Sequence, residues 1–151
     1  MSWSERLKEL GIELPGVAAP LAAYVPAVQS GKHVYTSGQL PFVDGVLAAT
    51  GKVGAEISPE EAKGHARTSA LNALAAVHAL VGIDNIARIV KVVGFVASAE
   101  GFTGQPAVVN GASELLGEVF GDAGTHARSA VGVAELPIGS PVEVELIVEV
   151  Q

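Results

Sequence analysis

A single arginine stands at the start of an otherwise uncharged, apolar stretch near the end of the chain, residues 127–133. Arg128 is one of only nine basic residues in the sequence. A guanidinium at the beginning of an apolar strand needs an anion, and its planar fork suits a carboxylate or phosphate held by two parallel hydrogen bonds. The pattern therefore makes Arg128 the first candidate for binding an anionic ligand. The alternative is an ordinary ion pair with Asp122 or Glu143.

Glu143 is the second candidate, and it lies in a segment where carboxylates alternate with apolar residues. If strands 129–134 and 142–148 pair antiparallel, Glu143 approaches the level of Arg128 from the neighbouring strand. A carboxylate in that place could position a water molecule or accept a proton as a general base. The alternation puts Glu143 and Glu145 on the same face, and we interpret Glu145 as a solvated edge charge.

Other side chains have both a structural and a functional interpretation. Tyr24 is either a core aromatic residue or a hydroxyl presented at a cleft. Asn110 is either exposed on a helix or a polar contact of the site. The four histidines are interpreted as surface or cap groups, because His65 and His78 lack the spacing of a metal pair. Phosphate-binding loops, dinucleotide-binding motifs and nucleophile elbows are absent from the sequence. We therefore expect no metal and no cofactor.

The elements that must position these groups follow from turn and capping signals. Two short strands are expected around residues 24–36, joined by a tight turn at 30–32, and the second strand leads into Ser37 and Gly38. A glycine there allows the backbone to approach a ligand closely. Residues 43–56 resemble an irregular loop or a weak hairpin, and residues 4–10 a short helix, at most a lid or an oligomer arm.

Two long helices and three further strands complete the prediction. A capping box at Ser58 begins a helix that ends at Gly82, and its alanine-rich face is expected to lie close against a sheet. Residues 86–96 form a central strand, and Pro106 begins a second helix that ends before Gly121. The order β-β-α-β-α-β-β describes an α+β sandwich, with both helices on one face of a mostly antiparallel sheet.

Composition limits the classes of function. With 151 residues we expect a single domain, residues 1–151, with residues 1–17 as an N-terminal extension. The hydrophobic content of 49% indicates either apolar surface hidden by self-association or simply an excess of alanine. A net charge of −7 without a basic stripe argues against nucleic-acid binding. Without cysteine or an uncharged apolar run of membrane-spanning length, a cytoplasmic location without membrane contact is expected.

A combination of motifs resembles the RidA family, also called the YjgF or L-PSP family, from about residue 18 onward. The matching features are Tyr24, Tyr35-Thr36-Ser37-Gly38-Gln39-Leu40-Pro41, Asn110, Ala127-Arg128-Ser129, Leu136-Pro137 and Val142-Glu143-Val144-Glu145. The resemblance implies a chorismate-mutase-like fold and a homotrimer with three ligand clefts between subunits. It also implies cofactor-independent hydrolysis of reactive enamines and imines, such as 2-aminoacrylate and 2-iminopropionate, to 2-keto acids and ammonia.

In that family the residue matching Arg128 binds the substrate carboxylate, and the residue matching Glu143 positions or activates water. Ser37, Gly38, Tyr24 and Asn110 would line the cleft. The chain departs from the family at Ala130, where many members have cysteine, and at Gly132, where a longer residue is usual. Both changes are expected to enlarge the pocket, which indicates a divergent member.

Three other functions remain open. The first is a non-catalytic module that senses a small carboxylate such as a 2-keto acid, for which Arg128 would suffice and Glu143 would be dispensable. The second, from an older label of the family, is an endoribonuclease or translation inhibitor, against which the acidic charge argues. The third is a structural or chaperone-like trimer.

Overall fold

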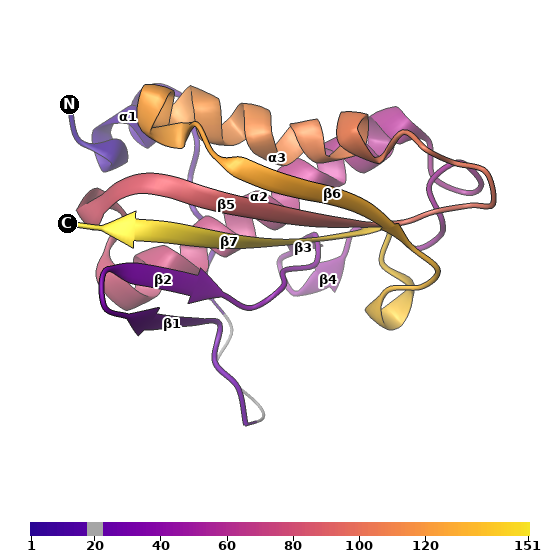
Figure 1. Cartoon of the computed structure of the whole chain (residues 1–151), viewed down its shortest axis with the longest axis horizontal. Helices are drawn as coiled ribbons and strands as arrows, with labels where there is room; N and C mark the ends of the chain where they lie inside the picture. The colour runs from indigo at the N-terminus through magenta and orange to yellow at the C-terminus, as the bar shows by residue number, and fades with distance from the viewer. Residues whose placement is uncertain (18–22) are drawn as a thin grey trace.

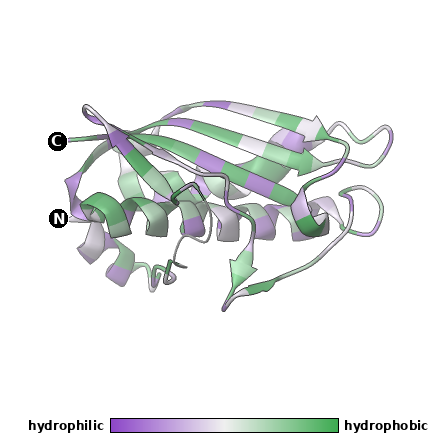
Figure 2. Ribbon diagram, turned by 90° about the horizontal axis from the view of Figure 1, so that it is seen from below, coloured by the Kyte–Doolittle hydropathy of each residue, from purple (hydrophilic) through white to green (hydrophobic). Residues whose placement is uncertain are grey.

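A five-stranded sheet covered on one face by two long helices forms the framework of the molecule (Figures 1 and 2). The computed structural model describes residues 1–17 and 23–151; the start of the family resemblance, at 18–22, lies outside them. The spatial order is β1-β2-β7-β5-β6. The strands are β1 (Ala27–Ser30), β2 (His33–Thr36), β5 (Ile86–Ala97), β6 (Ala127–Val133) and β7 (Val142–Val150). Only β5 and β6 pair in parallel among these strands, so the predicted α+β sandwich is confirmed.

The helices α2 (Pro59–Val81) and α3 (Gln105–Phe120) begin and end where their signals predict. The Ser58 hydroxyl accepts a hydrogen bond from the backbone N–H of Glu61, at 3.1 Å, and Gly82 ends α2 with a φ of 82°. Small residues let the two helices approach closely. A Cβ atom at Gly111 of α3 would collide with the backbone carbonyl of Lys63 on α2.

The antiparallel pairing of strands 129–134 and 142–148, on which the approach of Glu143 to Arg128 depended, does not form. β6 pairs with β5, and β7 pairs with the opposite side of β5, so β5 lies between them. The reason is the crossover through α3, since a helix that leaves β5 and returns to the same sheet delivers a parallel neighbour. β7 then takes a central place, where Val142, Val144, Leu146 and Val148 are buried beneath the helices.

Smaller elements complete the chain. The helix α1 (Trp3–Glu9) was expected, and its Trp3 indole N–H donates to the carbonyl of Ile86 at 2.8 Å while its ring packs edge-on against Phe120. The strands β3 (Phe42–Val43) and β4 (Val46–Leu47) form a short separate hairpin, which agrees with the weak hairpin that was one of the two alternatives for residues 43–56. Within residues 1–17 and 23–151, no helix combines the length and apolar character needed to span a membrane.

Candidate functional site

Arg128 projects from β6 toward α3, on the face of the sheet that the helices cover. Its Nη1 donates to the side-chain carbonyl oxygen of Asn110 at 2.9 Å and to the hydroxyl of Ser113 at 3.1 Å. Its Nη2 donates to the backbone carbonyl of Pro106 at 3.1 Å. Asn110 and Ser113 lie three residues apart, on one side of α3, so a single turn of helix supplies two of the three acceptors. Asn110 is therefore a polar contact of Arg128 and not a free surface group.

All three acceptors on Arg128 are neutral. In the part of the chain that the structure describes, Arg128 forms no ion pair, so the expected alternative of a salt bridge with Asp122 or Glu143 is wrong. The guanidinium carries five donor hydrogens, and the three bonds leave at least one on Nε and one on Nη2 unused. A half-buried cation with neutral partners and two remaining donors is suited to receive an anion.

A histidine lies behind these acceptors. The ring of His126 contacts the Ser113 hydroxyl through Nε2 at 2.8 Å and the Gly124 backbone carbonyl through Nδ1 at 2.6 Å. The sequence prediction missed this contact, because it treated His126 as a surface or cap group and did not consider Ser113. The available signal was the spacing of Asn110 and Ser113, which places both side chains beside the strand that begins after His126.

Glu143 lies on β7, on the face of the sheet that the helices leave open. Its neighbours Val142 and Val144 are buried, while Glu143 and Glu145 alternate with them on the opposite face, as predicted. Partial burial raises the pKa of Glu143 above its ordinary value, and the negative charge of Glu145 adds to this effect. A carboxyl group with a raised pKa is a better proton acceptor when ionised, which suits a general base.

Gly38 makes room for the carboxylate of Glu143. The segment after β2 is held against β7 by two backbone hydrogen bonds between Gln39 and Val144, of 2.8 and 3.0 Å. A Cβ atom at residue 38 would lie 2.5 Å from Oε2 of Glu143. The backbone at Gly38 thus approaches the carboxylate of Glu143 closely. The sequence analysis expected this glycine to allow a close approach to a ligand, and in the structure the close neighbour is Glu143.

Ser37 and Tyr24 belong to the same region. The Ser37 hydroxyl donates to the carbonyl of Val25 at 2.6 Å, and its backbone N–H donates to the carbonyl of Pro26 at 2.8 Å. These bonds tie the segment that follows Tyr24 to the end of β2. Tyr24 itself is 67% exposed, so it is not a core aromatic residue in this chain.

The predicted site residues therefore form two separate groups. Arg128, Asn110 and the adjacent Ala130 lie between β6 and α3 on the helix-covered face, whereas Glu143 lies with the end of β2 on the open face. Because β5 separates β6 from β7, the two groups are also roughly 10 Å apart across the sheet. A single chain does not bring Arg128 and Glu143 together.

The two departures from the family pattern have different structural settings. Ala130 is half-buried against the core. Next to Gly132, the amide nitrogen of Gln105 lies 2.7 Å from the position of a missing Cβ, and it donates to Ser98 and to the carbonyl of Phe102. Gln105 thus takes space that a side chain at residue 132 would use, so Gly132 does not simply enlarge a pocket.

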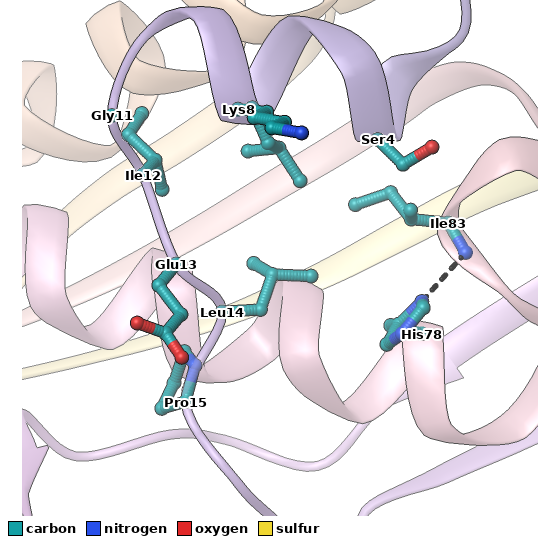
Figure 3. Close-up of a pocket in the computed structure, with 10 residues that line it drawn as sticks. Ser4, Lys8, Gly11, Ile12, Glu13, Leu14, Pro15, His78 and Ile83 are labelled. Atoms are coloured by element: carbon teal, nitrogen blue, oxygen red, sulfur yellow. Dashed lines mark hydrogen bonds between the residues drawn. The ribbon is translucent and has the colours of Figure 1, made fainter.

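A cavity of about 550 Å³ lies in a different place, between α1, residues 11–15 and the end of α2 (Figure 3). Its lining includes Lys8, Glu13 and His78, whose Nδ1 accepts a hydrogen bond from the backbone N–H of Ile83 at 3.0 Å. None of the predicted site residues lines this cavity. Within the described part of the chain, no group of three or more histidine or acidic side chains is arranged to hold a metal ion.

Comparisons with known proteins agree with the fold. "Protein TCP17" of Trypanosoma cruzi is 46% identical over 145 residues, which cover 95% of this chain and 91% of that protein. The 2-iminobutanoate/2-iminopropanoate deaminase of Dermatophagoides farinae is 32% identical over 142 residues, covering 93% and 95%. The crystal structure of Atu1372 from Agrobacterium tumefaciens, a protein of unknown function, superposes with a TM-score of 0.90 at 45% identity and covers 99% of this chain and 94% of its own.

A family profile matches almost the entire chain, over residues 4–150. The profile is described as YjgF/chorismate mutase-like, putative endoribonuclease. Together with the sheet order and the matching relatives, this confirms the resemblance noted from the sequence: the chain belongs to the YjgF/chorismate mutase-like family, which includes the RidA and L-PSP proteins.

Proposed function

We propose that this protein hydrolyses small 2-imino acids and their enamine tautomers to 2-keto acids and ammonia. The observation that carries the proposal is the half-buried Arg128, held by three neutral acceptors with donors left for an anion. The substrate carboxylate is that anion, bound by the Nε and Nη2 hydrogens. The named deaminase among the relatives supports the same chemistry.

The reaction needs only water and a proton carrier. Water adds to the imine carbon to form a tetrahedral carbinolamine, and Glu143 accepts the proton that the water loses. The same carboxyl then gives this proton to the nitrogen, which completes the carbinolamine. In a second transfer Glu143 takes the hydroxyl proton of the carbinolamine and passes it to the nitrogen, so that the C=O bond forms, the C–N bond breaks and ammonia leaves. The raised pKa of Glu143 supports both halves of this cycle.

Because Arg128 and Glu143 project from opposite faces of one sheet, the proposed site requires two subunits. In a homotrimer with clefts between subunits, one chain contributes Arg128 and Asn110, and its neighbour contributes Glu143 with Tyr24, Ser37 and Gly38. Exposed apolar side chains on the strands, including Val28, Tyr35 and Val131, favour such an assembly.

The test is a coupled assay in which 2-aminoacrylate and other imino acids are generated enzymatically and keto-acid formation is followed. We expect the wild type to exceed the spontaneous rate, Arg128→Ala to lose at least about a hundredfold in kcat/KM, and Glu143→Gln to lose mainly kcat. A wild-type rate equal to the spontaneous rate would contradict the proposal. If pyruvate binding still depended on Arg128, that result would instead favour the carboxylate-sensing alternative.

A further inference from the structure

A short chain of hydrogen bonds, here called the relay, joins Arg128 through Ser113 and His126 to the Gly124 carbonyl. The partners of His126 determine where the protons of the relay lie. The Gly124 carbonyl can only accept, so Nδ1 of His126 carries the proton in the 2.6 Å contact between them. In the neutral ring, Nε2 is then an acceptor, and the Ser113 hydroxyl donates to it across 2.8 Å. The donor hydrogen of Ser113 is thereby committed to His126.

The direction of the Ser113 hydrogen determines how its oxygen accepts a hydrogen bond from Arg128. With its hydrogen directed at His126, the Ser113 oxygen presents its lone pairs to Nη1 of Arg128 at 3.1 Å. Arg128 has only donors, so a hydroxyl free to rotate would make a poorer partner than one oriented in this way. Each bond of the relay is therefore directional, from Arg128 through Ser113 and His126 to the backbone at Gly124.

We propose that Ser113 and His126 are positioning residues, which hold the guanidinium of Arg128 in a fixed plane before an anion arrives. This role rests on the function proposed above, because a fixed guanidinium matters for a carboxylate that must meet it bidentately. Asn110 and Pro106 hold the same group from other directions. The relay removes the remaining freedom of rotation, so that less order has to be created when the ligand binds.

Two pairs of variants separate the relay from general packing. Ser113→Ala removes the hydroxyl, whereas Ser113→Thr keeps it. His126→Asn places an amide near the Nδ1 position and loses the contact with Ser113, whereas His126→Gln reaches the Nε2 position and keeps it. His65→Asn is the matched histidine control, because the His65 ring pairs with Glu61 of the same helix at 3.3 Å and is not part of the relay. Thermal unfolding of every variant reports whether it folds.

The first measurement needs no ligand and is independent of the proposed function. In ¹⁵N NMR spectra of the wild type, slow rotation about the Cζ–Nε bond is expected to give separate Nη1 and Nη2 signals for Arg128. These signals should merge in Ser113→Ala and His126→Asn and stay separate in Ser113→Thr, His126→Gln and His65→Asn. Separate signals in both Ser113→Ala and His126→Asn would overturn the positioning role.

The second measurement uses pyruvate as the carboxylate probe in titration calorimetry. Ser113→Ala and His126→Asn should each weaken binding about tenfold, and the double variant no further, because both break one relay. Additive losses would overturn the proposal. Unchanged pyruvate affinity in Arg128→Ala would instead contradict the proposed function, and the NMR result would still decide whether the relay orders Arg128.

Discussion

At the scale of single residues, the proposed chemistry depends on the surroundings of two charged side chains. Arg128 is surrounded by neutral oxygen atoms, so its positive charge stays available. Glu143 is partly buried beside a second carboxylate, so its negative charge is disfavoured. One group is prepared to bind an anion and the other to accept a proton.

Replacement of Arg128 by lysine tests the bidentate geometry. Lysine keeps the charge but offers a point-like ammonium, so Arg128→Lys should weaken pyruvate binding roughly tenfold, which is less than the loss in Arg128→Ala. Titration calorimetry of the three proteins measures the order. Equal affinity for wild type and Arg128→Lys would mean that charge alone holds the ligand.

The raised pKa of Glu143 makes a prediction about stability. A folded-state pKa above the ordinary value of 4.5 means that the folded protein holds this proton more tightly than the unfolded chain. The resulting stability is present below pH 4.5 and is lost as the pH rises through the folded-state pKa. Glu143→Gln, which stays neutral, should therefore have the higher urea midpoint at pH 7.5, and the difference should shrink at pH 4. A difference in urea midpoint that is larger at pH 4 than at pH 7.5 would contradict this prediction.

The same group makes a prediction about activity. If ionised Glu143 accepts the proton of water, kcat/KM should rise with pH through its raised pKa and then level off. Glu143→Gln should show a low rate without that rise. A rise that persists in the variant would assign the titration to another group.

At the scale of elements, close packing of α2 against α3 fixes the position of α3, the helix whose side chains bind Arg128. α3 carries Asn110 and Ser113, and its neighbour α2 touches it where Gly111 has no side chain. Gly94 on β5 makes similar room, because a Cβ there would lie 2.5 Å from a methyl group of Val109. The position of Asn110 and Ser113 thus depends on the two glycines at which α2 and β5 approach α3 closely.

Alanine substitutions at two glycines of α3, one packed against α2 and one exposed, test this close packing. Gly111→Ala pushes α3 away from the backbone at Lys63 and should cost about 2 kcal/mol or more of unfolding free energy. Gly117→Ala meets nothing within 4 Å and should stabilise the protein by about 0.5–1 kcal/mol through helix propensity. Urea unfolding measures both values. Similar effects of the two substitutions would contradict the close packing.

At the scale of the whole molecule, the separation of Arg128 from Glu143 makes the assembly part of the proposed mechanism. If each cleft takes Arg128 from one chain and Glu143 from the next, two inactive variants can complement each other. Subunits of Arg128→Ala and Glu143→Gln, unfolded together and refolded at equal amounts, should regain about a quarter of the wild-type activity, because about a quarter of the clefts combine two intact residues.

The controls for complementation are each variant refolded alone, and the mixed variants without unfolding. Sedimentation analysis should show a species of three chains. Refolded mixtures that remain as inactive as the separate variants would mean that one chain supplies both residues, which the sheet order of this fold does not allow without rearrangement.

Local signals in the sequence determined the elements and the individual candidates. Capping at Ser58, the stop at Gly82 and the alternation around Glu143 depend on neighbouring residues, so their predictions agree with the structure. The family match followed from short motifs in a characteristic order. Strand pairing depends on contacts between distant segments, and only the tertiary structure placed β5 between β6 and β7.

The same distinction applies to the site. The sequence by itself singled out Arg128, because a rare charge in an apolar setting is visible in one dimension, and it added Asn110 through the family resemblance. It could not show that Ser113 and His126 stand behind Arg128, since that contact forms only when α3 packs beside β6. Nor could it show that Arg128 and Glu143 face opposite sides, because the pairing register decides the face of each side chain and the strand order decides its neighbours.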